Sequence, residues 1–404
     1  MEVAIIGGGA AGFFAAITAK ENYPQATVVI FEKSKTVLTK VKVSGGGRCN
    51  LTNACSSIKE LSEAYPRGGK ALKRAFRVFN NQDAMQWFES RSVPLIIQED
   101  NCVFPLSQDS QSVIDCFLEQ TRRLKIKIEL ESGIKTLKKV GNKLQLGFIG
   151  GKLPPRSFDK VIVATGGSPK RGGLEWLEKS GHKIEYPVPS LFTFKMPDEP
   201  ITELMGVVVD NTLVSIQGTK IKAEGPLLVT HWGMSGPAIL KLSAFGARLL
   251  SEKGYDFKVQ VNWTHVRNQN IVLAELQNIA AKHSKKILTN VRPYALPERL
   301  WSYLLQKSAL PLDKRWGELG KSGLNRLIDV LTNDAYSVKG RTQFREEFVT
   351  CGGVSLESID FKTMQSRVCE NLYFAGEVMD IDGITGGYNF QAAWTTAFIA
   401  AKLS

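Results

Sequence analysis

The sequence is poor in the residues that build metal centres and redox dithiols. It has four histidines and six cysteines in 404 residues, and no two cysteines are spaced C-x-x-C. This argues against a zinc site, an iron–sulfur cluster or a dithiol, so we expect no metal site and mostly free, buried thiols. Two of the cysteines, Cys49 and Cys351, lie inside glycine-rich segments.

Long apolar runs are also missing. No uninterrupted stretch is long enough to cross a bilayer. The chain enters an apolar strand at Val3 with no basic segment before it, which argues against a cleaved signal. We therefore expect a cytoplasmic protein with no membrane partner. The length of 404 residues predicts two or three domains, and 43% hydrophobic with 23% charged residues is typical of a globular protein.

Acidic residues are scarce in two segments of the chain. Residues 34–80 contain ten Lys and Arg against two Glu, and residues 248–345 contain seventeen against eight acids. The net charge of the whole chain is +13. Concentrated positive charge favours a polyanionic partner, and ribosomal RNA is the one we expect. A basic surface that only aids solubility accounts for the same counts.

The first 31 residues have the pattern of a βαβ unit. An apolar run at 3–7 is followed by an apolar helical stretch at 10–19 and by a second apolar run at 27–31. Such a unit starts a parallel, doubly wound sheet. Further along the chain, residues 126–149 alternate as strands do, with Gly141-Asn142 as a hairpin turn.

The turn of this unit reads Gly7-x-Gly9-x-x-Gly12. The first glycine allows the tight turn, the second lets the backbone approach a pyrophosphate, and the third lets the helix pack on the sheet. Glu32 ends the second strand, where its carboxylate can accept hydrogen bonds from ribose hydroxyls. A carboxylate there disfavours a 2′-phosphate, so the motif predicts FAD or NAD and not NADP.

The C-terminal segment favours FAD over NAD. A strand at 371–375 closes on Gly376-Glu377, and a glycine-rich loop with Asp380 and Asp382 then opens an apolar helix that runs to Ala401. In flavoproteins of this type the acid contacts the ribityl or phosphate region, and the N-terminus of the last helix points at the flavin pyrimidine.

The pattern of hydrophobic and polar residues changes between 191 and 347. Short β-like runs predict an antiparallel sheet or small barrel over 191–265, and a pattern rich in Leu, Lys and Arg predicts helices over 266–347. The glycine-rich, buried-strand pattern returns at 348. We therefore expect an α/β fold, a Rossmann-type FAD-binding domain over 1–190 and 348–404, split by an inserted substrate domain.

Four segments resemble a known family, the BaiN/RdsA-type FAD-dependent flavoproteins. They are Lys42–Asn53 (KVSGGGRCNLTN), Thr230–Pro237 (THWGMSGP), Cys351–Val354 (CGGV) and Gly376–Gln391, in this order over nearly the whole chain. The resemblance implies a split FAD domain with an inserted β-barrel-like and helical domain. It also implies flavin reactions of several kinds: uridine reduction to dihydrouridine in 23S ribosomal RNA, reduction of steroid-like molecules, and amine oxidation.

The motifs and the resemblance together predict the cofactor site. We predict that FAD is bound by Gly7, Gly9, Ala11, Gly12, Glu32, Lys33, Ser44, Gly46, Arg48, Asn50, Ile134, Ala164, Thr165, Gly166, Gly376, Glu377, Gly387, Tyr388, Asn389, Phe390 and Gln391.

Three residues are candidates for catalysis. His231 can protonate a substrate or can simply hold its loop. Arg48 can donate to phosphate or flavin carbonyl oxygens. Cys49 is expected to pack rather than react, because no neighbouring thiol completes a redox pair. After His231, Ser235 and Pro237 have the pattern of a helix N-cap and first turn.

These observations predict an FAD-dependent reductase of a C=C or C=N bond, with NADH or NADPH as electron donor. No second G-x-G-x-x-G follows a strand, so the nicotinamide is expected to bind transiently over the flavin. The basic segments favour uridine in 23S ribosomal RNA as substrate. The alternatives are an oxidase or reductase of a small molecule, amine or steroid-like, and a non-catalytic FAD-binding adaptor.

Overall fold

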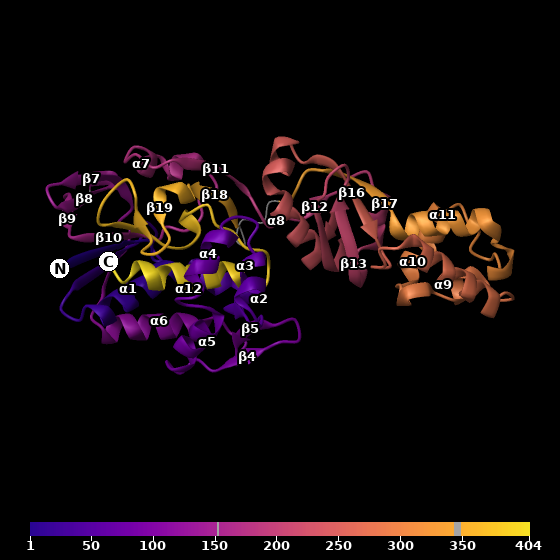
Figure 1. Ribbon diagram of the computed structural model, residues 1–404, viewed down its shortest axis with the longest axis horizontal. Coiled ribbons are helices and arrows are strands. Elements are labelled where there is room, and N and C mark those ends of the chain that lie inside the picture. Colours follow the sequence, from indigo (N-terminus) through magenta and orange to yellow (C-terminus); the bar gives the residue numbers. More distant parts are fainter. Residues whose placement is uncertain (152, 343–348) are drawn as a thin grey trace. The chain divides into compact units, whose positions relative to one another are not determined.

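The computed structural model describes residues 1–151, 153–342 and 349–404. The chain divides into two compact units (Figure 1). The first unit is formed by Met1–Ser190 and Phe344–Ser404, and the second by Leu191–Gln343. The expected boundary at 347 and 348 lies outside the described residues.

A mostly parallel sheet forms the centre of the first unit. Its five parallel strands are β1 (Glu2–Ile6), β2 (Thr27–Phe31), β6 (Lys127–Glu129), β10 (Lys160–Val163) and β21 (Leu372–Phe374). The full order is β19-β20-β21-β10-β1-β2-β6. In β1 and β2 the four residues after the first are buried, because helices or strands cover both faces of a parallel sheet.

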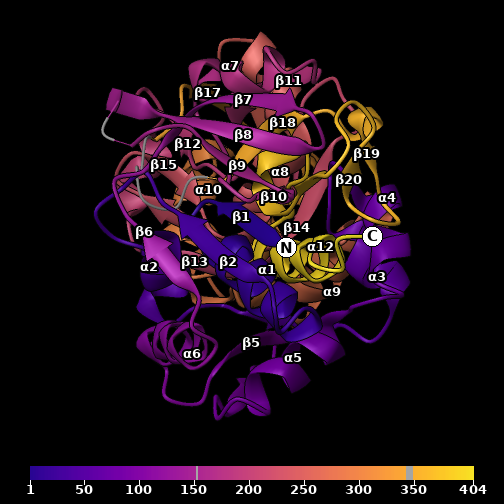
Figure 2. The ribbon, with the colours of Figure 1, turned by 90° about the vertical axis from the view of Figure 1, so that its left-hand side faces the viewer.

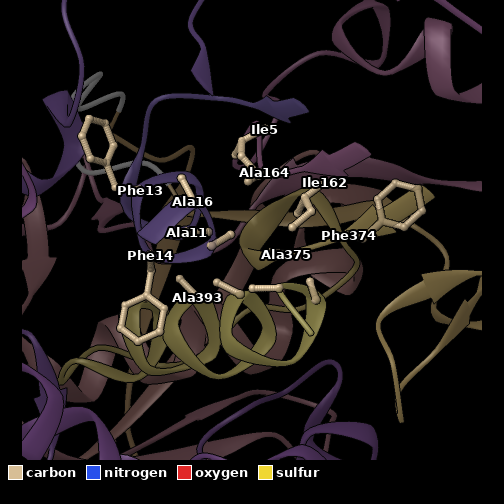
Figure 3. Close-up of a cluster of buried hydrophobic side chains, with 14 of the residues drawn as sticks. Ile5, Ala11, Phe13, Phe14, Ala16, Ile162, Ala164, Phe374, Ala375 and Ala393 are labelled. Carbon is tan, nitrogen blue, oxygen red and sulfur yellow. The ribbon is translucent and has the colours of Figure 1, made fainter. Parts of the chain in front are cut away.

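Helices α1 (Ala10–Asn22) and α12 (Tyr388–Ala400) pack on one face of this sheet, with α6 (Gln111–Arg123) next to α1. Alanines along α1 and α12 let the two helices approach closely, as Figure 3 shows for Ala11 and Ala393. Aromatic rings fill the space beside them. The C-terminal helix is therefore part of the core of the N-terminal βαβ unit.

A three-stranded antiparallel sheet covers the other face (Figure 2). It consists of β7 (Ile134–Val140), β8 (Lys143–Phe148) and β9 (Arg156–Phe158), and the turn of its first hairpin is Gly141-Asn142, which confirms the predicted hairpin. The remaining elements of the unit are α2 (Thr39–Gly47), β3 (Thr52–Asn53), α3 (Ile58–Glu63), α4 (Gly69–Ala75), α5 (Asn81–Glu89), β4 (Leu95–Ile97), β5 (Cys102–Pro105), α7 (Glu175–Glu178), β11 (Ile184–Pro189), β18 (Thr350–Val354), β19 (Ile359–Asp360) and β20 (Gln365–Ser366).

The second unit is an antiparallel sheet followed by helices. The sheet has the order β12-β15-β14-β13-β16-β17. Its edges meet where the Lys195 N–H donates to the Gly340 carbonyl at 3.0 Å, so it is a nearly closed barrel. Its elements are β12 (Phe194–Lys195), β13 (Val208–Ile216), β14 (Lys222–Thr230), β15 (Gly233–Ser235), α8 (Pro237–Glu252), β16 (Asp256–Asn262), α9 (Gln269–Lys282), α10 (Glu298–Lys307), α11 (Gly320–Thr332) and β17 (Asp334–Lys339).

Two local predictions in this unit are wrong. Ser235 ends strand β15, and the N-cap of α8 is Gly236, whose φ of +93° only glycine adopts easily. The range 266–347, predicted to be helical, also contains β17, because residues 334–339 alternate between buried and more exposed positions and complete the sheet. None of the described helices combines the length and apolar character that a membrane span requires.

Candidate cofactor site

The cofactor motifs of the first unit meet at one edge of the central sheet. Parallel strands place their carboxyl ends on the same side, so the segments after β1, β2, β10 and β21 are neighbours. These segments are 7–12, Glu32, 164–166 and 376–377. In the sheet, β2 lies on one side of β1 and β10 lies on the other side. Ligands of open α/β sheets bind at such a switch point.

The glycines of the first turn serve two different needs. A Cβ atom at Gly7 would lie 2.4 Å from the Ala164 carbonyl oxygen, and one at Gly12 would lie 1.9 Å from the Gly7 carbonyl oxygen. Both positions are closed by backbone packing. A Cβ atom at Gly9, the N-cap of α1, would meet no atom within 4 Å, and the same holds for Gly166. The open space in front of the α1 N–H groups fits a pyrophosphate.

Glu32 is held by the loops on both sides of it. One carboxylate oxygen accepts the Gly8 N–H at 2.8 Å, and the other accepts the Ser34 N–H at 2.8 Å. Each oxygen keeps lone pairs for ribose hydroxyls. Gly8 was not predicted, although a Cβ atom there would lie 2.8 Å from a methyl carbon of Val37.

The other residues predicted at this end of the site come from adjacent segments. The Ser132 N–H donates to the Glu32 carbonyl at 2.8 Å, which places the start of β7 beside Lys33. Ile134 is buried in the core cluster. Ala11 lies in the first turn of α1, where its methyl carbon is 3.0 Å from a Cβ atom built on Gly376. The contacts of these residues with a cofactor stay predictions.

The glycine-rich segment of the KVSGGGRCN motif leaves the helical conformation at Ser44. Gly45, Gly46 and Gly47 then follow with φ of +57°, +68° and +84°, a left-handed run that strongly favours glycine. No atom lies within 4 Å of a Cβ atom on Gly46. The segment therefore presents bare backbone, as a close approach to a cofactor requires.

Arg48 and Cys49 follow this run and have opposite environments. The Arg48 guanidinium lies over the Phe104 ring, 4.2 Å from its centre, and donates to the Gln108 amide oxygen at 3.2 Å. Both partners are neutral, so its charge is available to an anion. The Cys49 thiol is fully buried. Burial raises its pKa to about 12, against a hydrogen bond from Ser44 that lowers it, so the thiol is neutral at pH 7 and its environment supports packing.

The next residues of the motif dock on the start of α12. With its amide oriented to satisfy both groups, Asn50 accepts the Gly387 N–H at 3.3 Å and donates to the Thr52 carbonyl at 3.0 Å. The Thr52 hydroxyl donates to the buried Gln391 amide oxygen at 2.6 Å. A Cβ atom on Gly387 would lie 2.3 Å from the Thr52 carbonyl oxygen. The predicted residues Asn50, Gly387 and Gln391 thus form one connected unit.

The other residues predicted at this helix start also have internal partners. Asn389 exchanges two hydrogen bonds with the backbone of Gly383, at 2.8 and 3.0 Å. The Phe390 ring is stacked on the Trp394 ring at 5.4 Å, and the Tyr388 carbonyl accepts the Tyr65 hydroxyl proton at 2.6 Å. These contacts fix the direction of the first turn of α12. A direct contact of the three side chains with FAD stays a prediction.

Glu377 links three segments of the first unit. Its carboxylate accepts the Thr350 N–H at 2.8 Å and pairs with the Lys40 ammonium at 3.0 Å. A Cβ atom on Gly167 would lie 2.3 Å from the same carboxylate. Sequence reasoning missed Gly167, Lys40 and Thr350. The adjacent pair of glycines at 166 and 167 was the available signal for the first of them.

A buried ion pair that sequence reasoning missed closes the loop before α12. Asp382 has a fully buried side chain and pairs with Arg67 through both carboxylate oxygens, one of them at 2.6 Å from Nε. The Ser190 hydroxyl donates to the same carboxylate. Burial raises the pKa of the Asp382 carboxyl, and the Arg67 charge opposes this rise.

His231 belongs to the second unit. It lies in the exposed turn between β14 and β15, with its ring 4.4 Å from the Trp232 ring. A role in catalysis stays a prediction. Among the described residues no group of His, Cys, Asp and Glu side chains could hold a metal ion.

Comparison with known proteins shows the family of this chain. The family described as the HI0933-like protein Rossmann domain matches residues 1–403. The chain belongs to this family. It is similar to the 3-dehydro-bile acid delta(4,6)-reductase of Clostridium scindens, at 27% identity over 99% of this chain and 98% of the relative. It is also similar to the ribosomal RNA dihydrouridine synthases of Haemophilus influenzae and Escherichia coli, each at 28% identity over 98% of this chain and 96% of the relative.

Solved structures support the fold. The 3-ketosteroid delta1-dehydrogenase of Sterolibacterium denitrificans matches with a TM-score of 0.51 at 12% identity, over 99% of this chain and 98% of that one. The E. coli quinol fumarate reductase subunit FrdA matches with a TM-score of 0.50 at 14% identity, over 100% of this chain and 69% of that one. With the open glycines and Glu32 that fit FAD, the family identifies the chain as an FAD-dependent oxidoreductase, as the sequence predicted.

Proposed function

We propose that this chain is an NADH- or NADPH-dependent flavin reductase of a C=C bond, and that its substrate is uridine in 23S ribosomal RNA. The observation that carries the choice of substrate is the exposed positive charge of the second unit. Two of the similar curated proteins are ribosomal RNA dihydrouridine synthases.

Exposed cations lie in two loops of the second unit that are joined by backbone hydrogen bonds. The Leu288 N–H donates to the Lys314 carbonyl at 2.8 Å, and the Trp316 N–H donates to the Lys286 carbonyl at 3.0 Å. The two loops form an antiparallel bridge at Ile287 and Arg315, and Lys286 and Arg315 are both exposed. Neither side chain has an ion pair with any residue in the described ranges. Unpaired exposed cations are what a phosphate backbone requires.

In this proposal the cofactor is bound by residues of the first unit. FAD, when bound, supplies hydride exchange through its isoalloxazine ring. The N–H groups at the start of α1 would hold its pyrophosphate, Glu32 would hold a ribose, and Arg48 would supply positive charge. Reduction of a C=C bond also requires a proton donor, and we assign this role to the imidazole of His231.

A second candidate is the reduction of a steroid-like small molecule. The bile acid reductase covers as much of the chain as the RNA-modifying relatives do, at nearly the same identity. In that case the basic surface serves solubility only.

The deciding experiment is deletion of the gene in its host, followed by mass spectrometry of nuclease fragments of 23S ribosomal RNA. We expect one dihydrouridine to disappear and to return with the wild-type gene. A His231→Asn gene should restore it slowly, because loss of a general acid costs on the order of 10²–10⁴ in rate. Unchanged dihydrouridine in a host that carries the modification rules out the RNA substrate, and steroid-like enones with NADPH are then the substrates to assay.

A further inference from the structure

The second unit contains a cavity of about 690 Å³ on one face of its barrel-like sheet. Ser215 on β13 pairs with Lys222 on β14 and with Gln260 on β16, and all three side chains line the cavity. The neighbouring residues of β13, Val214 and Ile216, point to the opposite face and are buried in the core. Strand alternation thus separates a polar cavity from an apolar core.

Two kinds of polar side chain line this cavity. Some are held by internal hydrogen bonds: Asn268 caps α9 through the Asn270 N–H at 2.9 Å, and Gln269 donates to the Thr332 hydroxyl at 2.9 Å. Others make no hydrogen bond or ion pair through their side chains with any described residue. These free groups are Ser215, Lys222, Gln260, Asn270 and Asn333.

The hydrogen-bonding pattern and charge of the free groups indicate which class of ligand the cavity would bind. Three of them are amides, each with a donor and an acceptor side by side, which matches the edge of a nucleobase. Lys222 adds a positive charge that is not paired, and Leu213 offers an apolar contact. Arg267 also lines the cavity, but it shares the Glu224 carboxylate, at 3.2 Å, with His265. No carboxylate is among the lining residues of this described cavity, and Glu224, which pairs with Leu213 across the strands, has its carboxylate on Arg267 and His265.

We propose that this cavity binds one nucleotide of a single-stranded RNA segment, with Lys222 at a phosphate and the free amides at the base. The inference rests on the proposed RNA substrate and extends it, because every lining residue belongs to the second unit and none to the cofactor motifs. The volume of the cavity lies within the range of roughly 300–1,000 Å³ that is usual for ligand pockets. Single-stranded RNA exposes its base edges to such side chains.

The test is binding of labelled oligoadenylate and oligouridylate by fluorescence anisotropy at several salt concentrations, with the FAD-loaded full chain. Lys222→Gln should weaken binding of both and reduce the slope of log K against log salt by about 0.7, the value for one phosphate contact in a single strand. Gln260→Leu should weaken binding of one base type by about tenfold without changing this slope. Lys253→Gln is the matched control, because Lys253 is exposed at the end of α8, carries the same charge and does not line the cavity.

A parallel arm with AMP and NADPH as competitors distinguishes a strand of RNA from a free nucleotide. Binding of free nucleotides alone, lost in Lys222→Gln, overturns the RNA assignment. If both cavity variants bind RNA as well as the Lys253→Gln control does, the inference is overturned, whereas the proposed reduction is not affected. Loss of binding in the cavity variants, together with unchanged dihydrouridine after gene deletion, leaves the nucleotide site standing and contradicts the proposed reduction. Flavin content and far-ultraviolet circular dichroism must match the wild type in each variant.

Discussion

Each unit buries an aspartate against a base, but the two pairs join very different lengths of chain. In the first unit Asp382 binds Arg67, 315 residues away in sequence, and Ser190, 192 residues away. In the second unit Asp334 binds Lys307, only 27 residues away. The first pair ties together the segments of a split domain, whereas the second is local to its own sheet and helix.

The bases of the two pairs also differ in their access to water. The Arg67 side chain is 15% exposed, against 30% for Lys307. Burial raises the pKa of both aspartate carboxyls, and the paired base opposes the rise in each case. Asp334 has further donors in the Trp263 indole, at 2.9 Å, and the Tyr336 hydroxyl. We therefore expect the stability of the first unit to depend more on the Arg67–Asp382 pair than the stability of the second unit depends on the Lys307–Asp334 pair. The reason is that the less exposed Arg67 side chain cannot move into water as easily as Lys307.

The largest effect is expected when the Arg67–Asp382 pair is broken. Asp382→Asn should lower the free energy of unfolding of the first unit by about 3–5 kcal/mol, because it removes the charge of the carboxylate that pairs with the buried Arg67 side chain. Asp334→Asn should cost the second unit only about 1–3 kcal/mol, since Lys307 can extend into water. Hydrogen exchange under increasing urea, resolved by peptide, measures each unit separately. Equal costs, or the reverse order, contradict the comparison.

The next effect separates the two kinds of glycine in the first unit. Gly12→Ala should destabilise it by about 3 kcal/mol, because the new methyl group meets the Gly7 carbonyl and the helix must move away from the sheet. Gly9→Ala should leave thermal stability of the FAD-free protein unchanged and weaken FAD binding by at least about tenfold, or about 1.4 kcal/mol. Titration of the FAD-free protein with FAD measures the affinity. Normal affinity in the Gly9→Ala variant would show that no cofactor occupies this space.

A smaller effect is expected at Glu32. Glu32→Gln preserves the shape but removes the charge and one of the two acceptors for the Gly8 and Ser34 N–H groups. We expect FAD affinity to fall about tenfold, equivalent to about 1.4 kcal/mol. The melting transition of the second unit should not change. Glu224→Gln in the second unit is the control, because it should leave FAD affinity unchanged and affect only the second unit.

The smallest effect is expected at Cys49. Cys49→Ala should keep turnover within a few fold and cost about 1 kcal/mol through lost packing. The Cys49 pKa is raised to about 12 by burial, so the folded state favours the protonated thiol. This contribution is fully present below the ordinary cysteine pKa of about 8.5 and is lost as the pH rises toward about 12. The stability difference between wild type and variant should therefore be constant to within about 0.2 kcal/mol between about pH 6 and 8, and should shrink above about pH 9.

The sequence determined the βαβ unit and its cofactor motif because those demands are local. The strand at 27–31 matches β2, and the glycine turn and Glu32 occur where the motif placed them. A left-handed glycine or an open backbone at a helix start is required by the neighbouring residues themselves. The change in the pattern of hydrophobic and polar residues near 191 likewise reflects a different pattern of burial, period two in the barrel and nearly continuous in the parallel strands.

Only the tertiary structure decided the contacts between segments far apart in the sequence. Arg67 and Asp382 carry no pattern that pairs them, and β17 continues a sheet whose other strands lie more than 70 residues earlier. The cavity beside Ser215 depends on the register of β13 with β16 and on which amides remain unpaired after folding. Pairing, register and leftover hydrogen-bonding capacity are properties of the packed chain, because they depend on which partners each side chain has found in space.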